Sequence, residues 1–339
     1  MSFKFIDLFA GIGWFRIAMN NLWWECVFTS EIDKHCQATY RANFWEFPYG
    51  DIHQVDEKII PKHDVLCWWF PCQPFSISGL KKWFSDETKG NLFFEIIRIV
   101  NYHKPKVLFL ENVKWIKNHD WWNTMKTIEK LLDEEWYNLY CKVLNAVNWW
   151  VPQARQRLYM VCIRKDIDKW FTFPKWTNQF TKIKDIIVSD TLTKHLVITK
   201  DNMKYDENKE IKNYWKPLKL WTIWKDWQWN RIYSENTVWI TLTASSWWVA
   251  SKTWGYLING KVRKLHPTEC KRMQGFPEDF KIVVSETQAQ KQFWNAVAVP
   301  VVEAIWSNFL GYINNNQWVF SQENLVQKLL KVDLETKTK

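Results

Sequence analysis

The sequence predicts an α/β fold in which a largely parallel sheet is covered by helices on both faces. Length allows this, because 339 residues suffice for one large domain with a substantial core and a smaller second domain. Amphipathic helical stretches at 91–103 and 122–135 lie between some of the predicted strands. The strands themselves are short apolar, β-rich runs at 3–9, 25–32, 65–70, 106–113, 139–144 and 158–163.

The first of these runs begins a strand-turn-helix-strand unit. It ends at a turn that contains Gly11 and Gly13, and a helical stretch follows before the second strand ends near Glu31. A glycine turn lets backbone N–H groups and a helix N-terminus approach a ligand closely, and an acid at the end of the second strand can bind ribose hydroxyls. A purely structural turn, or the turn of a dehydrogenase, would have the same pattern.

A second acid, Asp51 in Tyr-Gly-Asp-Ile, lies at the expected end of a third strand, where it can reach an adenine amine. The alternative is a turn or helix-cap aspartate, which Asp residues often supply. The glycine turn, Glu31 and Asp51 together favour a cofactor that contains adenosine.

The composition of the chain changes in its second half. From about residue 175 to about 262 it is polar, Lys-rich and irregular, and we expect 185–266 to form a separate small domain. His266-Pro267-Thr268-Glu269 resembles a helix start, and the long apolar segment 296–313 is expected to return to the first domain. The predicted division is 1–184 plus 295–339 for the catalytic domain, 185–266 for the small domain and 267–294 for a hinge.

Charge and cysteine usage narrow the class of protein. A formal net charge of +10 favours a polyanionic partner, although charge for solubility alone is the alternative. The seven cysteines contain no CxxC pair and the seven histidines are scattered, so we expect no metal site and no disulfide framework. The N-terminus enters directly into a strand, and no 18-residue apolar span is expected to follow. These features predict a soluble, cytoplasmic protein without a membrane association.

Three chemically suggestive groups stand at the ends of predicted strands. Cys72 lies in Phe-Pro-Cys-Gln-Pro, Glu111 begins Glu-Asn-Val, and Arg155 and Arg157 lie in Gln-Ala-Arg-Gln-Arg. A thiol, a carboxyl and paired guanidiniums suit nucleophilic attack on an electron-poor ring beside a phosphate backbone. The alternatives are a buried small cysteine, a structural ion pair for Glu111 and solvated arginines.

These motifs, in this order and spacing, resemble the DNA cytosine-5 methyltransferases, and in particular the bacterial HhaI-type members. The likeness spans nearly the whole chain and includes Phe5–Gly11, Phe70–Gln73, Phe75–Gly79, Glu111–Lys114, Arg263–Pro267 and Lys291–Asn295. It implies a Rossmann-like methyltransferase fold with a mixed sheet and a smaller, irregular β-rich target-recognition domain. It also implies S-adenosylmethionine as cofactor, held by Phe9, Gly11, Ile12, Gly13, Glu31, Ile32, Asp51, Ile52, Pro71 and Asn295.

The resemblance also implies a mechanism and a partner. Cys72 would add to C6 of a cytosine flipped out of double-stranded DNA, with Glu111 at N3 and Arg157, supported by Arg155, at O2 or a phosphate. The target would be of the GCGC type, and a cognate restriction endonuclease and a monomeric state are expected. The residues implied to contact DNA are Ser78, Gln228, Arg231 and Thr241.

Other functions remain open at this point. The same fold supports methylation of cytosine in tRNA, and a chain that has lost cofactor affinity would be a DNA-binding protein without activity. A nicotinamide oxidoreductase accounts for the glycine turn but leaves Cys72, Glu111 and the basic segment unexplained.

The composition itself is anomalous. The chain has 9 Gly and 27 Trp, whereas average usage gives roughly 24 glycines in this length. Tryptophan stands in turn-like positions that suit a residue without a side chain. Where the family has glycine, this chain has Trp at 14, 69, 115, 150, 247, 248 and 294. We therefore expect that many of these codons are UGA, decoded here as Trp but as Gly in the source organism.

Overall fold

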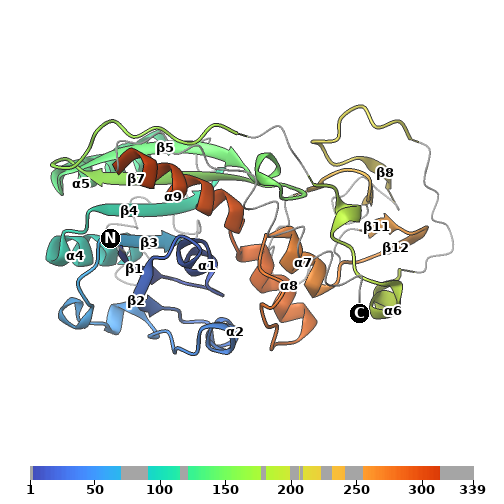
Figure 1. Cartoon of the computed structure of the whole chain (residues 1–339), viewed down its shortest axis with the longest axis horizontal. Coiled ribbons are helices and arrows are strands. Elements are labelled where there is room, and N and C mark those ends of the chain that lie inside the picture. The colour runs from blue at the N-terminus through green and yellow to red at the C-terminus, as the bar shows by residue number, and fades with distance from the viewer. Residues whose placement is uncertain are drawn as a thin grey trace.

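The computed structural model describes residues 3–69, 91–114, 121–176, 181–198, 206, 209–222, 231–240 and 255–313. Within these residues the largest element is a six-stranded sheet, shown on the left of Figure 1. Five strands run in the same direction and β7 is antiparallel to both of its neighbours, so the predicted largely parallel, mixed sheet is confirmed. The strands in spatial order are β2 (Glu25–Ser30), β1 (Lys4–Leu8), β3 (Val65–Trp69), β4 (Val107–Val113), β7 (Gln156–Arg164) and β5 (Tyr137–Asn145).

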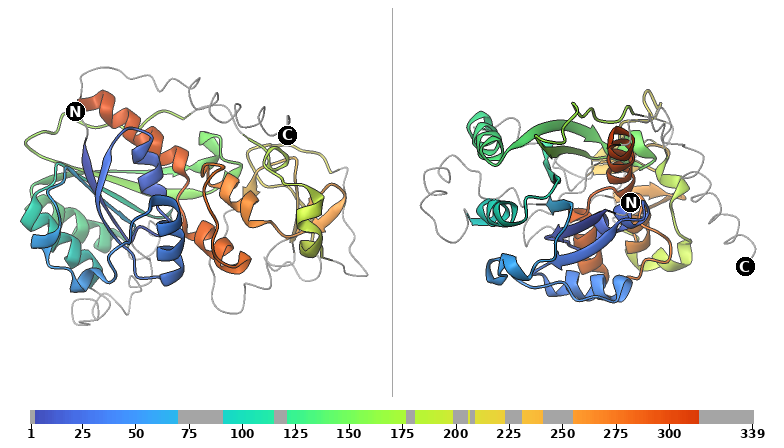
Figure 2. Two further views of the ribbon diagram at one scale, coloured as in Figure 1. Left: turned by 60° about the horizontal axis from the view of Figure 1, so that its bottom comes forward. Right: turned by 60° about the vertical axis from the view of Figure 1, so that its left-hand side comes forward.

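Helices cover both faces of this sheet, because successive residues of each strand point to opposite faces and both sets are apolar. Phe5, Val65 and Phe109 belong to one apolar cluster with α1 (Trp14–Asn20) and α9 (Val299–Ile313). Their neighbours Ile6, Leu66 and Leu108 point to the opposite face and pack with α4 (Asn91–His103) and α5 (Trp121–Glu134). The right-hand view of Figure 2 shows these helix pairs on opposite sides of the strands. Both faces are buried because each strand is apolar at successive positions.

A smaller sheet lies at the other end of the molecule (Figure 1). Its order is β12 (Lys261–Arg263), β11 (Gly255–Ile258), β9 (Arg231–Ser234) and β8 (Lys219–Thr222), and the short helix α6 (Asp190–Thr193) lies at the same end. These strands fall within 185–266, where the small domain is predicted. The two-residue strand β10 (Trp239–Ile240) instead pairs with β6 (Gln153–Ala154), so it links this region to the larger unit.

Helices α7 (Pro267–Met273) and α8 (Glu286–Asn295) lie between the two sheets in Figure 1, in the segment predicted as a hinge. The predicted helix start is confirmed. His266 caps α7 by accepting the Thr268 N–H at 3.2 Å, and the Glu269 carboxylate accepts the His266 N–H at 2.9 Å. Glu269 also forms a fully buried ion pair with Arg263 at 2.6 Å, which fixes α7 against β12.

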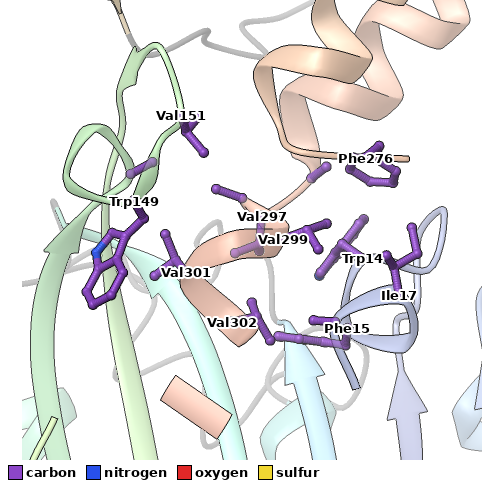
Figure 3. Packing of buried hydrophobic residues seen from close by; sticks show 14 of the residues in the cluster. Trp14, Phe15, Ile17, Trp149, Val151, Phe276, Val297, Val299, Val301 and Val302 are labelled. Carbon is purple, nitrogen blue, oxygen red and sulfur yellow. The ribbon is translucent and has the colours of Figure 1, made fainter. Parts of the chain in front are cut away.

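The expectation of no 18-residue apolar span is wrong. In the described part of the chain, Glu286–Ile313 is long and apolar enough to cross a membrane by length and composition, but 78% of its apolar window is buried. This stretch forms α8 and α9, and α9 packs against α1. Figure 3 shows Val299, Val301 and Val302 facing Trp14, Phe15 and Trp149. The apolarity is therefore explained by a central place in the core.

Candidate active site

The predicted glycine turn connects β1 to α1. Phe9 and Gly11 have positive φ, and Gly13, with φ of 88°, is the N-cap of α1. A side chain at position 13 would meet the Phe44 ring at 2.3 Å, so only glycine fits there. Ile12 between the two glycines is fully buried. The turn therefore has the predicted form, with the N-terminus of α1 following directly.

Glu31, one residue beyond β2, holds this turn in place. Its carboxylate accepts the Gly11 N–H at 2.7 Å and the Asp33 N–H at 2.8 Å. Burial raises the pKa of Glu31, and these two N–H donors oppose the rise. The neighbouring Ile32 is 63% exposed, which places an apolar side chain at the open edge of the turn.

The segment that carries Asp51 is not the predicted third strand: one isolated bridge, between Tyr49 and Ser30, ties it to the end of β2. The Glu31 N–H donates to the Tyr49 carbonyl at 2.8 Å, and the Ser30 hydroxyl donates to the Gly50 carbonyl at 2.8 Å. The two acids thus lie at the same edge of the sheet. Asp51 also caps the short 3-10 helix η1 (Ile52–Gln54) by accepting the His53 N–H, and Ile52 is buried. A cap role for Asp51 is therefore present in the structure. Its role toward adenine stays a prediction.

The remaining described cofactor candidate, Asn295, ends α8. The Trp294 carbonyl before it accepts a hydrogen bond from Arg155 at 2.9 Å. This contact connects the predicted cofactor edge to the predicted catalytic arginines.

One residue does not suit a cofactor that approaches the turn. The ring of Trp14 packs directly on Gly11, since an added Cβ there would lie 2.0 Å from a ring carbon of Trp14. Trp14 is 2% exposed and its ring lies 6.3 Å, centroid to centroid, from that of Trp69 at the end of β3. Figure 3 shows the same ring beside Val299 and Phe276. The backbone and acids of the turn fit an adenosine-bearing group, whereas the Trp14 side chain does not.

Glu111, in β4, is fully buried and its environment is unusual. Burial raises its pKa to about 7, although the nearby charges of Arg157 and Arg155 act in the opposite direction. Arg157 Nε lies 3.2 Å from Glu111 Oε1, an ion pair without the angle of a hydrogen bond. The side chain of Trp69, which lies beside Glu111 in the neighbouring strand, also lowers this pKa by hydrogen bonding to the carboxylate. A buried carboxyl of this kind is available to a ligand.

Strand register brings the charged residues together. In the antiparallel β4–β7 pair, Glu111 lies opposite Tyr159 and Val113 lies opposite Arg157. Arg157 is thus a diagonal neighbour of Glu111 on one face of the sheet. Arg155 precedes β7 and is 2% exposed, and burial together with the charge of Arg157 lowers its pKa to about 9. The predicted grouping of Glu111, Arg155 and Arg157 is present.

The last described residue before Cys72 lies beside this group. Strand β3 ends at Trp69, which is paired in register with Glu111. Cys72 itself and four other predicted site residues, Pro71, Ser78, Gln228 and Thr241, lie outside the described residues. Arg231 begins β9 opposite Thr222 of β8, in the smaller sheet.

Two supporting residues were missed by the sequence analysis. The Gln274 amide donates to the Phe293 carbonyl at 3.1 Å and to the Gln153 side chain at 3.3 Å, so it ties the segment before Arg155 to the end of α8. Asp7 lies inside β1 with both carboxylate oxygens unpaired among the described residues, and burial raises its pKa well above the usual range. Asp7 could have been found because it is the one acid in the apolar run 3–9. Nothing in the sequence around Gln274 indicates its role.

Comparison with known proteins agrees with this arrangement. The structure resembles that of the Entamoeba histolytica methyltransferase EhMeth (TM-score 0.72, 17% identity, covering 93% of this chain and 98% of that one). It also resembles the S. pombe Dnmt2 methyltransferase (TM-score 0.69, 15% identity, covering 93% and 100%). These likenesses establish the methyltransferase fold.

Proteins found by sequence comparison have higher identity to this chain than these two structures. The chain is 45% identical over 312 residues to the type II methyltransferase M.HhaI of Haemophilus parahaemolyticus, covering 92% of this chain and 95% of that protein. It is 40% identical over 328 residues to M.HpaII of Haemophilus parainfluenzae, covering 93% and 91%. Residues 3–310 match the family model for C-5 cytosine-specific DNA methylases. The chain therefore belongs to the C-5 cytosine-specific DNA methylase family, and its class of activity is DNA (cytosine-5) methyl transfer.

Proposed function

We propose that the protein methylates one cytosine of a short duplex sequence, flipped out of the helix, by covalent catalysis through Cys72 with S-adenosylmethionine as methyl donor. The observation that carries the proposal is Glu111. A fully buried carboxyl with a pKa of about 7, held beside the Arg157 guanidinium, suits an acid that shares a proton with a ring nitrogen. A cytosine stacked within a duplex cannot reach such a group, so the base must leave the stack.

The chemistry begins at the pyrimidine ring. The Cys72 thiolate adds to C6, and Glu111 donates a proton to N3 as electron density moves onto the ring. The C5 carbon then becomes nucleophilic. The methyl donor supplies an electrophilic methyl group at a sulfonium. Loss of the C5 proton to a base restores the C5–C6 double bond and expels the thiolate, and N3 returns its proton to Glu111, so atoms and charge balance.

Arg157 and Arg155 support Glu111 in this scheme. Arg157 lies 3.2 Å from the carboxylate, and its guanidinium would face the ring or a phosphate. Arg155 is a positioning residue, because its hydrogen bond to the Trp294 carbonyl joins the Glu111 group to the end of α8. The turn Phe9–Gly13, with Glu31, Ile32, Asp51, Ile52, Pro71 and Asn295, would hold the donor.

The finer biological assignment is also a proposal. Relatives named as type II methyltransferases favour a role in protecting host DNA beside a cognate endonuclease, in the cytoplasm and as a monomer. A GCGC-type target follows from the likeness to M.HhaI, with Ser78, Gln228, Arg231 and Thr241 as the residues that contact the bases. The predicted small domain at 185–266 would face the duplex, and 267–294 would set its orientation.

A trapping experiment tests the covalent step. A duplex with 5-fluorocytosine at the target should remain attached to the protein, because fluorine at C5 cannot leave as a proton does. Attachment should require the methyl donor and be lost in Cys72→Ala. The chain should be tested both as written and with Trp14→Gly. No attachment in either form would reject the mechanism, and attachment to tRNA in place of the duplex would assign the RNA substrate.

The Cys72→Ala variant gives a second prediction. It should lose methyl transfer to below detection while its duplex affinity changes by less than about tenfold, because the thiol acts after the base is bound. Labelled-methyl incorporation and fluorescence anisotropy measure the two quantities. Equal loss of activity and affinity would show that Cys72 is a packing residue.

A further inference from the structure

Tryptophan has an unexpected backbone conformation in this molecule. Among the described residues, eight that are not glycine have positive φ, and five of these are tryptophans: Trp23, Trp45, Trp136, Trp150 and Trp170. The chain has 21 Phe and 11 Tyr, yet among those described only Phe9 has positive φ. Positive φ is uncommon for any residue with a side chain and is an outlier for a bulky one. Aromatic character therefore does not explain the pattern.

Three of the five lie just after helices, where glycine is the usual residue. After α1, the Trp23 N–H donates to the Asn20 carbonyl and the Trp24 N–H to the Met19 carbonyl, which is the hydrogen-bond pattern of a Schellman motif. Trp45, with φ of 59° and ψ of 20°, ends α2 through its N–H to the Arg41 carbonyl. Trp136 follows α5 with φ of 73°. These positions call for a residue without a Cβ.

Burial does not compensate for the backbone strain at most of these sites. Trp23, Trp45 and Trp170 are 86%, 82% and 85% exposed. An exposed indole gains little hydrophobic stabilisation, so packing does not explain a bulky residue in the left-handed region. Glycine would meet the backbone requirement at all three positions without strain.

Glycine also suits position 14, where Trp14 is buried, but for a different reason. Trp14 does not have positive φ. Instead, its ring covers the face of Gly11 that a ligand contacting the backbone would use. Its indole N–H also has no hydrogen-bond partner among the described residues, although buried indoles usually find one. A glycine at 14 would open this face and remove the unpaired donor.

We propose that the natural protein carries glycine at Trp14, Trp23, Trp45, Trp136, Trp150 and Trp170, because the gene encodes these positions by a codon that its own organism translates as glycine. The left-handed positions support this independently of the protein's activity. The consequence at Trp14 rests on the proposed function: the glycine-bearing chain binds S-adenosylmethionine and the chain as written does not.

Peptide masses of the protein isolated from its source cells test the proposal directly. Peptides that span positions 23, 45, 136, 150 and 170 should have the masses of glycine-containing sequences. The gene should carry UGA at these codons. Peptides with tryptophan at these positions would overturn the proposal whatever the enzyme's activity.

Matched variants of the full chain test the backbone argument. Trp45→Gly should have a higher urea midpoint than Trp45→Ala, because both remove the indole but only glycine relieves the left-handed strain. Trp170 should behave in the same way. The control is Trp176, which is 70% exposed without positive φ, and there the alanine variant should have the higher midpoint. Alanine above glycine at 45 and 170 would contradict the proposal.

Calorimetry with S-adenosylmethionine completes the test. Trp14→Gly should bind the cofactor at least tenfold more tightly than the chain as written. If the native protein has glycine masses but Trp14→Gly does not bind S-adenosylmethionine, the codons are read as glycine and the assigned cofactor site is rejected. Tight binding by the chain as written would show that Trp14 does not obstruct the site.

Discussion

At the scale of single residues, Glu111 links structure to chemistry through its protonation. The folded protein raises the pKa of this carboxyl from its ordinary value of 4.5 to about 7 because burial disfavours the charged form. Between these two values the folded state retains a proton that the unfolded chain has released. Stability therefore decreases as pH rises through this window, by up to about 3 kcal/mol at about 1.4 kcal/mol per pKa unit.

The Glu111→Gln variant tests this prediction. Its side chain has nearly the same shape but does not titrate, so the variant should gain stability relative to the parent as pH rises from about 4.5 to 7. Urea unfolding at several pH values measures the difference in unfolding free energy. A difference that stays constant across this range would show that Glu111 is ionised throughout in the folded protein.

The sequence predicted that Glu111 and Arg157 lie together because Glu111 ends one apolar strand and the segment with Arg157 opens another. It could not predict that Arg155 donates to the Trp294 carbonyl, since that contact joins residues 139 positions apart. Nor could it decide between ligand and cap for Asp51, because an Asp before a turn is compatible with both. Residue types indicate chemistry, whereas hydrogen-bond partners depend on the tertiary fold.

At the scale of elements, the central strands and helices were predictable from their apolar pattern. The run predicted at 139–144 is β5, Tyr137–Asn145, and the helix predicted at 91–103 has those bounds. The pairing of β10 with β6 was not predictable. Each is two residues long, and two residues carry no periodic signal. The β10–β6 pairing, which joins the two regions of the molecule, could therefore not be predicted from the sequence.

Asp168 shows how one side chain fixes neighbouring elements. Its carboxylate accepts hydrogen bonds from Asn138 and Tyr140 of β5, both at 2.6 Å, and from Tyr312 of α9 at 2.7 Å. Asp168→Ala should lower the unfolding free energy by about 2 kcal/mol, because three donors lose their acceptor. Its close neighbour Asp166 is a matched control.

Among the residues that the structure describes, the ion pair of Asp166 is with Arg164, two positions away, and that pair is partly exposed. Exposed pairs contribute about 0–1 kcal/mol, so Asp166→Ala should change stability little. Thermal and urea unfolding of the two variants measure the contrast. Equal effects would show that the contacts of Asp168 do not hold α9 to β5.

At the scale of the whole molecule, charge is the property most relevant to a DNA substrate. The chain has 46 Lys and Arg against 36 Asp and Glu. If this excess contacts phosphates, binding releases counterions and affinity decreases steeply with salt. For about six phosphate contacts or more, duplex affinity should decrease roughly 10³-fold between about 50 and 200 mM salt. The alternative, that the charge serves solubility, predicts almost no dependence.

Anisotropy titrations at several salt concentrations distinguish these alternatives, and the Cys72→Ala variant is suitable because it forms no covalent bond to the base. The slope of log affinity against log salt counts the phosphates that are neutralised. It should be the same for target and unrelated duplexes if phosphate contacts position the protein while base contacts select the site. A flat slope would mean that the positive charge of this chain is not directed at DNA, even though its family acts on DNA.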